Sequence, residues 1–167
     1  MLKDEVALSK EKMKKINIEP IIQSVVDDYN SIYKVKKDIK INYEDDGKKE
    51  YSINGIENRI EQMIANLLDN SISFTEKGGK IIVNISISSN RKITVKIIDE
   101  GQGFKEKDTS KIFKRFYSNR PDKFGEHSGL GLNIVKNLVE LHDGKILASN
   151  RPNNKGAIIE ISFPSMQ

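Results

Sequence analysis

Apolar residues recur along the chain with two different periods, which separate helices from strands. Residues 20–35 carry apolar side chains three and four positions apart, which predicts an amphipathic helix with Pro20 in its first turn. A second stripe of the same kind predicts a long helix that ends near Phe74-Thr75. We expect Asn54 to cap that long helix at its start.

Strict alternation of apolar and polar residues predicts strands, two of which form a hairpin around Ser88-Ser89-Asn90. The strands are expected at residues 39–43, 50–53, 81–87, 93–97, 144–149 and 156–163. A last helix is expected to start near Gly129 and to bury Leu130, Ile134, Val135, Leu138 and Leu141. This order predicts an α+β fold, a two-layer α/β sandwich with a mixed sheet and helices packed on one face.

Composition fits one globular domain without cysteine chemistry. The chain has 167 residues, 37% of them hydrophobic, and neither a cysteine nor an apolar run that could span a bilayer. No secretion signal is visible, so we expect a cytoplasmic domain in a reducing compartment. The highly charged residues 1–15 are expected to be a solvated helix or linker, and residues 16–167 the domain proper.

Positive charge is concentrated in one segment. The net charge is +4, which is too small at this length to indicate a nucleic-acid partner. Residues 105–123 hold seven Lys or Arg and three acids, an excess equal to that of the whole chain. The segment therefore favours a local anionic ligand over nucleic acid or membrane.

The long helix carries two carboxamides on one face. Asn66 and Asn70 lie four residues apart, and Ser73 continues their face. Their oxygens suit a hydrated Mg²⁺ that bridges ligand phosphates. Exposed or capping asparagines are the structural alternative.

Two glycine-rich segments follow. Asp99 ends a predicted strand and precedes Gly101 and Gly103, so its carboxylate suits an exocyclic amine such as that of adenine; an ordinary acidic turn is the alternative. Residues 129–132, GLGL, open the last helix, where backbone N–H groups favour a phosphate. A tight loop-to-helix junction would fit equally well.

A basic, aromatic segment lies between the two glycine-rich motifs. Phe113 and Phe116 suit a core anchor, whereas Arg115 and Arg120 suit phosphate oxygens. A solvated basic loop is the structural alternative.

Taken in order, four motifs resemble the N, G1, F and G2 boxes of bacterial sensor histidine kinases. They are NLLDN (66–70), DEGQG (99–103), IFKRFY (112–117) and GLGL (129–132). The stretches NLLDNSISFTEKGGKI and FKRFYSNRPDKFGEHSGLGL look most like envelope-sensing kinases of the ChvG type. The resemblance implies an ATP-binding catalytic domain with the Bergerat fold, shared by gyrase, Hsp90, histidine kinases and MutL.

The resemblance also implies residue roles. Asn70 would bind Mg²⁺ with Asn66 close to the metal and phosphates, and Asp99 would hold the adenine amine. Residues 105–128 would form the ATP lid. The implied catalytic residues are Asn66, Arg115 and Arg120. The implied nucleotide-binding residues are Asn66, Asn70, Phe74, Asp99, Gly101, Gly103, Arg115, Tyr117, Arg120, Gly129, Leu130, Gly131 and Leu132.

Two departures from the family pattern qualify these expectations. Many members continue the N box with Lys and Tyr, where this chain has Ser73 and Phe74. Neither histidine has the context of the family's phosphoacceptor, so we expect His127 to be a lid residue and His142 to be structural. The implied partners are therefore a separate dimerisation domain that carries the acceptor His, and a response regulator. The full-length protein would be a homodimer in the bacterial inner membrane.

Two other functions fit the same motifs. A stand-alone serine kinase of the anti-sigma-factor type would share the fold, and so would a nonenzymatic ATP-dependent partner-binding module. The IFKRFY segment favours the sensor kinase.

Overall fold

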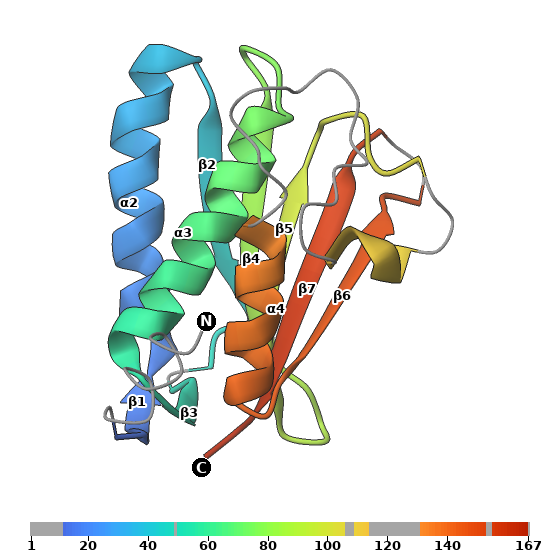
Figure 1. Cartoon of the computed structure of the whole chain (residues 1–167). Coiled ribbons are helices and arrows are strands. Elements are labelled where there is room, and N and C mark those ends of the chain that lie inside the picture. Colours follow the sequence, from blue (N-terminus) through green and yellow to red (C-terminus); the bar gives the residue numbers. More distant parts are fainter. Residues whose placement is uncertain (1–11, 49, 106–108, 114–130, 153–154, 167) are drawn as a thin grey trace.

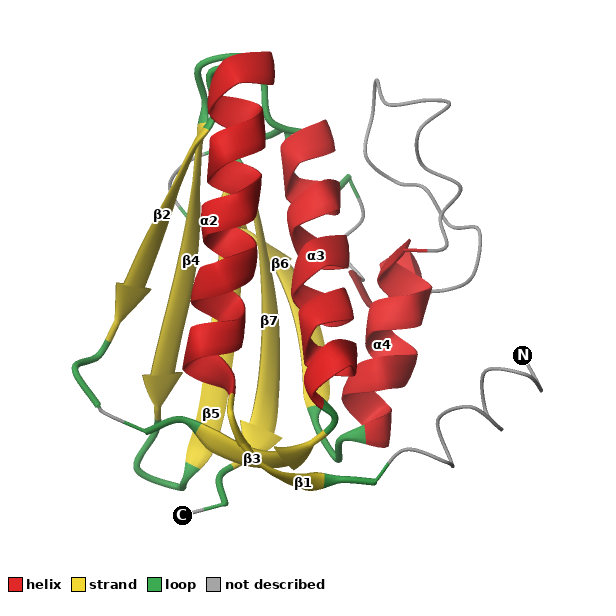
Figure 2. Ribbon diagram, turned by 90° about the vertical axis from the view of Figure 1, so that its left-hand side faces the viewer, coloured by secondary structure: helices red, strands yellow, loops and turns green. Residues whose placement is uncertain are grey.

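The computed structural model describes residues 12–48, 50–105, 109–113, 131–152 and 155–166. Three helices cover one face of a five-stranded sheet, and a two-stranded sheet closes one end (Figures 1 and 2). In chain order the elements are β1 (Lys14–Asn17), α2 (Ile18–Lys36), β2 (Lys40–Asp45), β3 (Ser52–Gly55), α3 (Glu57–Ser73), β4 (Lys80–Ile87), β5 (Lys92–Asp99), the 3-10 helix η1 (Thr109–Phe113), α4 (Gly131–Leu141), β6 (Lys145–Asn150) and β7 (Ala157–Pro164).

The large sheet is mixed, with strand order β2-β4-β5-β7-β6. β2 runs parallel to β4, and every other neighbouring pair in this sheet is antiparallel. β5, β6 and α3 therefore end at the same end of the molecule, opposite β1 and β3 (Figure 1). The predicted α+β sandwich with helices on one face is confirmed.

Alternation along the strands separates the two faces of the sheet. Ile81, Val83 and Ile85 of β4 are fully buried under the helices, while the residues between them are partly exposed on the other face. On that open face Lys96 of β5 pairs with Glu160 of β7 at 3.8 Å.

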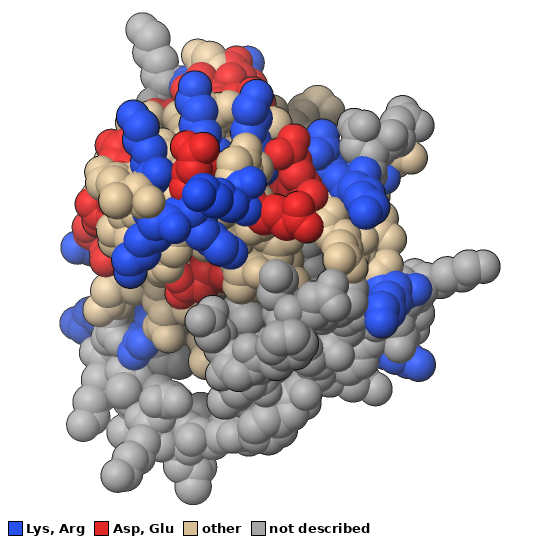
Figure 3. Space-filling model, turned by 90° about the horizontal axis from the view of Figure 1, so that it is seen from above, with Lys and Arg blue, Asp and Glu red and all other residues tan. Residues whose placement is uncertain are grey.

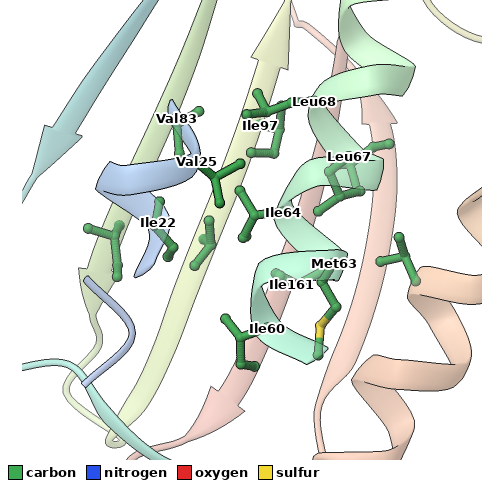
Figure 4. Close-up of a cluster of buried hydrophobic side chains, with 14 of the residues drawn as sticks. Ile22, Val25, Ile60, Met63, Ile64, Leu67, Leu68, Val83, Ile97 and Ile161 are labelled. Atoms are coloured by element: carbon green, nitrogen blue, oxygen red, sulfur yellow. The ribbon is translucent and has the colours of Figure 1, made fainter. Parts of the chain in front are cut away.

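The core lies between the helices and the sheet. Figure 4 shows Ile22 and Val25 of α2 beside the buried row of α3, with Val83 and Ile97 contributed by the sheet. The α3 row recurs every three or four residues, as an amphipathic helix requires. Its buried apolar members are Ile60, Met63, Ile64, Leu67, Leu68 and Ile72.

The starts of the two long helices differ in how they are capped. Asn17 caps α2 by accepting a hydrogen bond from the Glu19 N–H at 3.3 Å, and Pro20 lies in the first turn as predicted. The prediction that Asn54 caps the long helix is wrong. Asn54 lies in β3, and the cap position of α3 is Ile56.

A histidine from a distant part of the chain replaces the missing cap. The Nε2 atom of buried His142 accepts the Ile56 N–H at 3.1 Å, and its Nδ1–H donates to the Leu138 carbonyl at 2.7 Å. The ring thereby joins the start of α3 to the end of α4. His142 has the structural role predicted for it.

Three further expectations need correction. Lys14 and Lys15 belong to β1, which pairs with β3, so the last residues of the segment expected to be a linker are part of a strand. Ile134 and Leu141 are 37% and 39% exposed rather than buried. Both lie on the flank of the α4 stripe, because the residues that face the core are Val135, Leu138 and Val139. Leu130 lies outside the described residues.

None of the helices in the described part of the chain is both long and apolar enough to cross a membrane.

The buried His142 predicts a pH-dependent stability. Burial lowers the pKa of His142 below its usual value of 6.5, so the unfolded chain takes up a proton that the folded chain does not. The free energy of unfolding should therefore be unaffected by this group above about pH 6.5. As the pH decreases from there towards the folded pKa, it should fall by up to about 1.4 kcal/mol per pH unit.

Urea unfolding at a series of pH values measures this slope. His142→Gln removes the titrating group and should flatten it. Equal slopes in the wild type and His142→Gln would contradict the assignment.

Candidate nucleotide-binding site

The C-terminal half of α3, an amphipathic helix, carries two carboxamides on one face. Asn66 is half-buried, Asn70 is only 7% exposed, and both lie on one face because they are four residues apart. The Ser73 hydroxyl donates to the Asn70 carbonyl at 2.9 Å, which extends the polar face to the end of the helix. The structure therefore brings these residues together as the sequence predicts.

Asn70 has an unmet hydrogen-bonding capacity. Its Nδ2 atom is buried and has no hydrogen-bond partner among the described residues. The two ends of a carboxamide exchange by a 180° rotation, so either the nitrogen or the oxygen of Asn70 can occupy this buried position. A buried polar group of this kind calls for a ligand, an ion or an ordered water.

Asp99 occupies a core-facing position at the end of β5. The alternation that buries Ile93, Val95 and Ile97 continues to Asp99, which is 1% exposed. Its Oδ1 atom accepts the Gly101 N–H at 2.9 Å and the Ala157 N–H at 3.2 Å. The carboxylate is therefore held under the helix layer by backbone donors from two segments.

The segment after Asp99 approaches other parts of the backbone closely. Gly103 has a positive φ of +78°, and a Cβ atom there would lie 2.6 Å from the Asn150 side-chain oxygen. Gly156 has φ +137°, and a Cβ atom there would lie 1.9 Å from the Asp99 carbonyl oxygen. A side chain at residue 103 would have to displace the Asn150 side chain, and one at residue 156 would have to shift the backbone.

Asn150, Gly156 and Ala157 therefore belong to the surroundings of the site, although no sequence motif indicates them. They lie at the connection between β6 and β7, about fifty residues after Asp99. The sequence around them, NRPNNKGA, is typical of an ordinary turn. Only the sheet register, which places β7 beside β5, reveals their proximity to Asp99.

Phe74 and the residues around it close the end of α3. Phe74 is buried at the C-cap, and Thr75 Oγ1 donates to the Ser71 carbonyl at 2.7 Å. The Lys37 ammonium donates to the carbonyls of Ile72 and Thr75 at 3.0 and 3.1 Å. A cation thus lies at the turn that contains Ser73 and Phe74, although it comes from another element.

This end of the molecule is rich in lysine. Figure 3 looks onto it and shows blue side chains gathered around a few red ones. Lys36 ends α2, Lys40 and Lys80 begin β2 and β4, and Lys77 lies in the turn between α3 and β4. Such a concentration of positive charge favours the approach of an anionic ligand.

The described part of the predicted lid packs against the domain. Phe113 of η1 is buried, as expected for an anchor, and its carbonyl accepts the Asn133 side-chain N–H at 3.1 Å. Gly131 is exposed at the start of α4, and a Cβ atom there would meet no described atom within 4 Å. Leu132 packs against the core while partly exposed. The other predicted residues, Arg115, Phe116, Tyr117, Arg120, His127, Gly129 and Leu130, lie outside the described residues.

The fold and the relatives of the chain define its class. Residues 55–167 match the family described as histidine kinase-, DNA gyrase B- and HSP90-like ATPases. The catalytic domain of the histidine kinase ThkA matches with a TM-score of 0.79 at 26% identity, over 93% of this chain and 97% of that domain. The architecture is that of an ATP-binding catalytic domain of a sensor histidine kinase.

The chain belongs to this ATPase family, and its relatives include a kinase of the type that the motifs indicated. Sensor protein ChvG of Agrobacterium fabrum is 35% identical over 155 residues, which are 89% of this chain and 26% of that protein. The chain spans about a quarter of the length of the ChvG proteins that it matches. A structure of ThkA in complex with the response regulator TrrA also matches, with a TM-score of 0.76 at 25% identity. The predicted resemblance to sensor histidine kinases is confirmed.

The close approach of Gly156 to Asp99 leads to a stability prediction. Gly156→Ala would place a methyl group 1.9 Å from the Asp99 carbonyl oxygen, so the hairpin must shift. We expect a loss of about 2–4 kcal/mol in the free energy of unfolding, measured by urea denaturation.

Gly131→Ala is the matched control, because the added methyl group lies at a helical position and meets nothing within 4 Å in the described part of the chain. It should be neutral, or stabilising by up to about 1 kcal/mol. Equal stabilities of the two variants would contradict the contact between Gly156 and Asp99.

Proposed function

We propose that this chain binds Mg²⁺-ATP between α3, the end of β5 and the start of α4. It then presents the γ-phosphate to a histidine on a separate dimerisation domain. The observation that carries the proposal is Asn70, a buried carboxamide with one polar end unpartnered among the described residues. It lies on the helix that packs against β5, whose last residue is the buried Asp99. One end of the molecule thus offers an unmet polar group to a ligand and a buried carboxylate to an amine.

In this proposal Asp99 selects the base. A buried carboxylate accepts hydrogen bonds only, so it pairs with the exocyclic amine of adenine and opposes the carbonyl that guanine carries in that place. Gly101 and Gly103 let the backbone approach the flat ring, and the ring of Phe74 borders the nucleotide from the end of α3.

The residues of α3 suit a magnesium ion. Within the described residues no cluster of three or more His, Asp or Glu side chains could hold a metal. In this proposal a metal would take the carboxamide oxygen of Asn70, with Asn66 nearby, and complete its shell with phosphate oxygens and water. When bound, Mg²⁺ offsets charge on the phosphates during transfer. Arg115 and Arg120 add positive charge from the lid.

Asn66 favours transfer of the phosphoryl group to a protein over hydrolysis of ATP. A carboxamide cannot take a proton from water, so Asn66 cannot serve as the general base for hydrolysis. The chain should therefore bind ATP and hydrolyse it slowly until an acceptor histidine is supplied. By the same proposal a response regulator then receives the phosphoryl group, and the full-length protein is a homodimer in the inner membrane with this domain in the cytoplasm.

Asp99→Asn tests the adenine assignment. We expect the affinity for a nonhydrolysable ATP analogue to fall about 100-fold or more, because a charge-assisted hydrogen bond is lost. Isothermal titration calorimetry measures this affinity. The control Asp28→Asn removes an exposed carboxylate of α2 and should bind as the wild type does. Wild-type affinity in Asp99→Asn would refute the assignment.

Asn70→Ala tests the metal assignment. The wild-type chain should bind the analogue more tightly in Mg²⁺ than in EDTA. Asn70→Ala should bind the analogue about equally tightly under the two conditions. An unchanged response to Mg²⁺ in the variant would exclude Asn70 as a metal ligand.

A transfer assay tests the reaction itself. Labelled ATP, this chain and a separately produced dimerisation domain of a ChvG-type kinase should yield label on the histidine of the added domain. Label on His127 or His142 would overturn the acceptor argument. Binding without transfer to any acceptor would instead support a nonenzymatic module.

A further inference from the structure

Asn150, the last residue of β6, holds the backbone of the loop that follows β5. Its Oδ1 atom accepts the Phe104 N–H at 2.6 Å, and its Nδ2 atom donates to the Phe104 carbonyl at 3.0 Å. One side chain thus meets both polar groups of one backbone residue. This pairing reproduces the hydrogen bonds that a neighbouring strand would supply.

The cross-strand partner of Asn150 holds the other end of the same loop. Asn150 is paired in register with Ala157 of β7, and the Ala157 N–H donates to the Asp99 carboxylate at 3.2 Å. Residues 99 and 104 are therefore both attached to a single cross-strand pair. Residues 100–104 belong to no helix or strand, so their placement depends on side-chain and loop contacts of this kind.

The geometry leaves little freedom between the two attachments. Gly103 approaches Asn150 so closely that a Cβ atom would lie 2.6 Å from its Oδ1 atom. The Gly101 N–H is tied to the same Asp99 oxygen that Ala157 contacts. A displacement of Asn150 would therefore move the glycines together with Phe104.

We infer that Asn150 is a positioning residue for nucleotide binding, which fixes the Gly101–Gly103 backbone relative to the Asp99 carboxylate. The inference rests on the proposed function, since it assigns that loop to the adenine. Asn150 acts through the loop and need not touch the nucleotide. Its contribution to affinity comes from preorganisation, because a loop already in place loses less entropy when the base binds.

The chain contains a matched control for this inference. Asn30 of α2 makes the same double contact with Ile41 of β2: its Nδ2 atom donates to the Ile41 carbonyl at 2.8 Å, and its Oδ1 atom accepts the Ile41 N–H at 2.9 Å. Asn30 is more buried than Asn150, so its removal should destabilise the fold at least as much. It fixes an edge strand and no part of the adenine loop.

The test measures ADP affinity by calorimetry on the full 167-residue chain, together with the thermal midpoint of each variant. Asn150→Ala should lower ADP affinity about tenfold. It should also reduce the ratio of ADP affinity to GDP affinity. Asn30→Ala should lower the thermal midpoint at least as much and leave ADP affinity within about twofold of the wild type. Asn150→Asp keeps the acceptor and loses the donor, so its ADP affinity should fall between those of the wild type and Asn150→Ala.

The outcomes separate this inference from the proposed function. If Asn150→Ala and Asn30→Ala both bind ADP with the affinity of the wild type, Asn150 is structural only and the inference is overturned. A wild type that binds no ADP removes the proposed function, and the inference with it. If Asn150→Ala does not fold, Asn150→Asp decides, and wild-type affinity in that variant overturns the inference.

Discussion

A carboxylate buried in the core-facing register of β5 is the constraint on which the rest of this site depends. Desolvating the ionised side chain of Asp99 costs several kcal/mol unless donors replace the lost water. The backbone N–H groups of Gly101 and Ala157 supply that replacement. The loop after β5 must therefore turn back on itself, β7 must begin beside the end of β5, and residue 156 must lack a side chain.

In the helix layer above this carboxylate, buried polar groups also need hydrogen-bonding partners. α3 buries an apolar row against the sheet, yet its C-terminal half also carries Asn66 and Asn70 and ends at the same end of the molecule as β5. Buried amides are tolerated when a partner satisfies them, and one end of Asn70 has none among the described residues. A nucleotide with its metal would satisfy the carboxamide and match the lysines gathered at the same end (Figure 3).

Most of the fold could be predicted from the periodic spacing of apolar residues. The long helices, the central hairpin and the last two strands follow from local spacing, because each buries one face. Contacts between distant parts of the chain could not be predicted from local spacing. The cap of α3 comes from His142, 86 residues away from Ile56, so the local candidate Asn54 looked sufficient and was wrong. β1 was missed because its short, lysine-rich sequence is a strand only when β3 lies beside it.

The site shows the same division. Asn66, Asn70, Phe74 and Asp99 could be proposed as candidates because their motifs are contiguous in sequence, and α3 and β5 end at the same end of the molecule. Asn150 and Gly156 could not, because their proximity to Asp99 and to the loop after β5 arises from the β5–β7–β6 order of the sheet. Their sequence is that of a turn, and only the register shows that this turn adjoins the loop.

The most direct test of the central claim is a crystal structure of this chain with Mg²⁺ and a nonhydrolysable ATP analogue. We predict that the exocyclic amine of adenine donates to the Asp99 carboxylate at about 2.7–3.2 Å, with the Asn70 side chain on the metal. An adenine bound away from Asp99, with Asn70 contacting neither metal nor phosphate, would contradict the account.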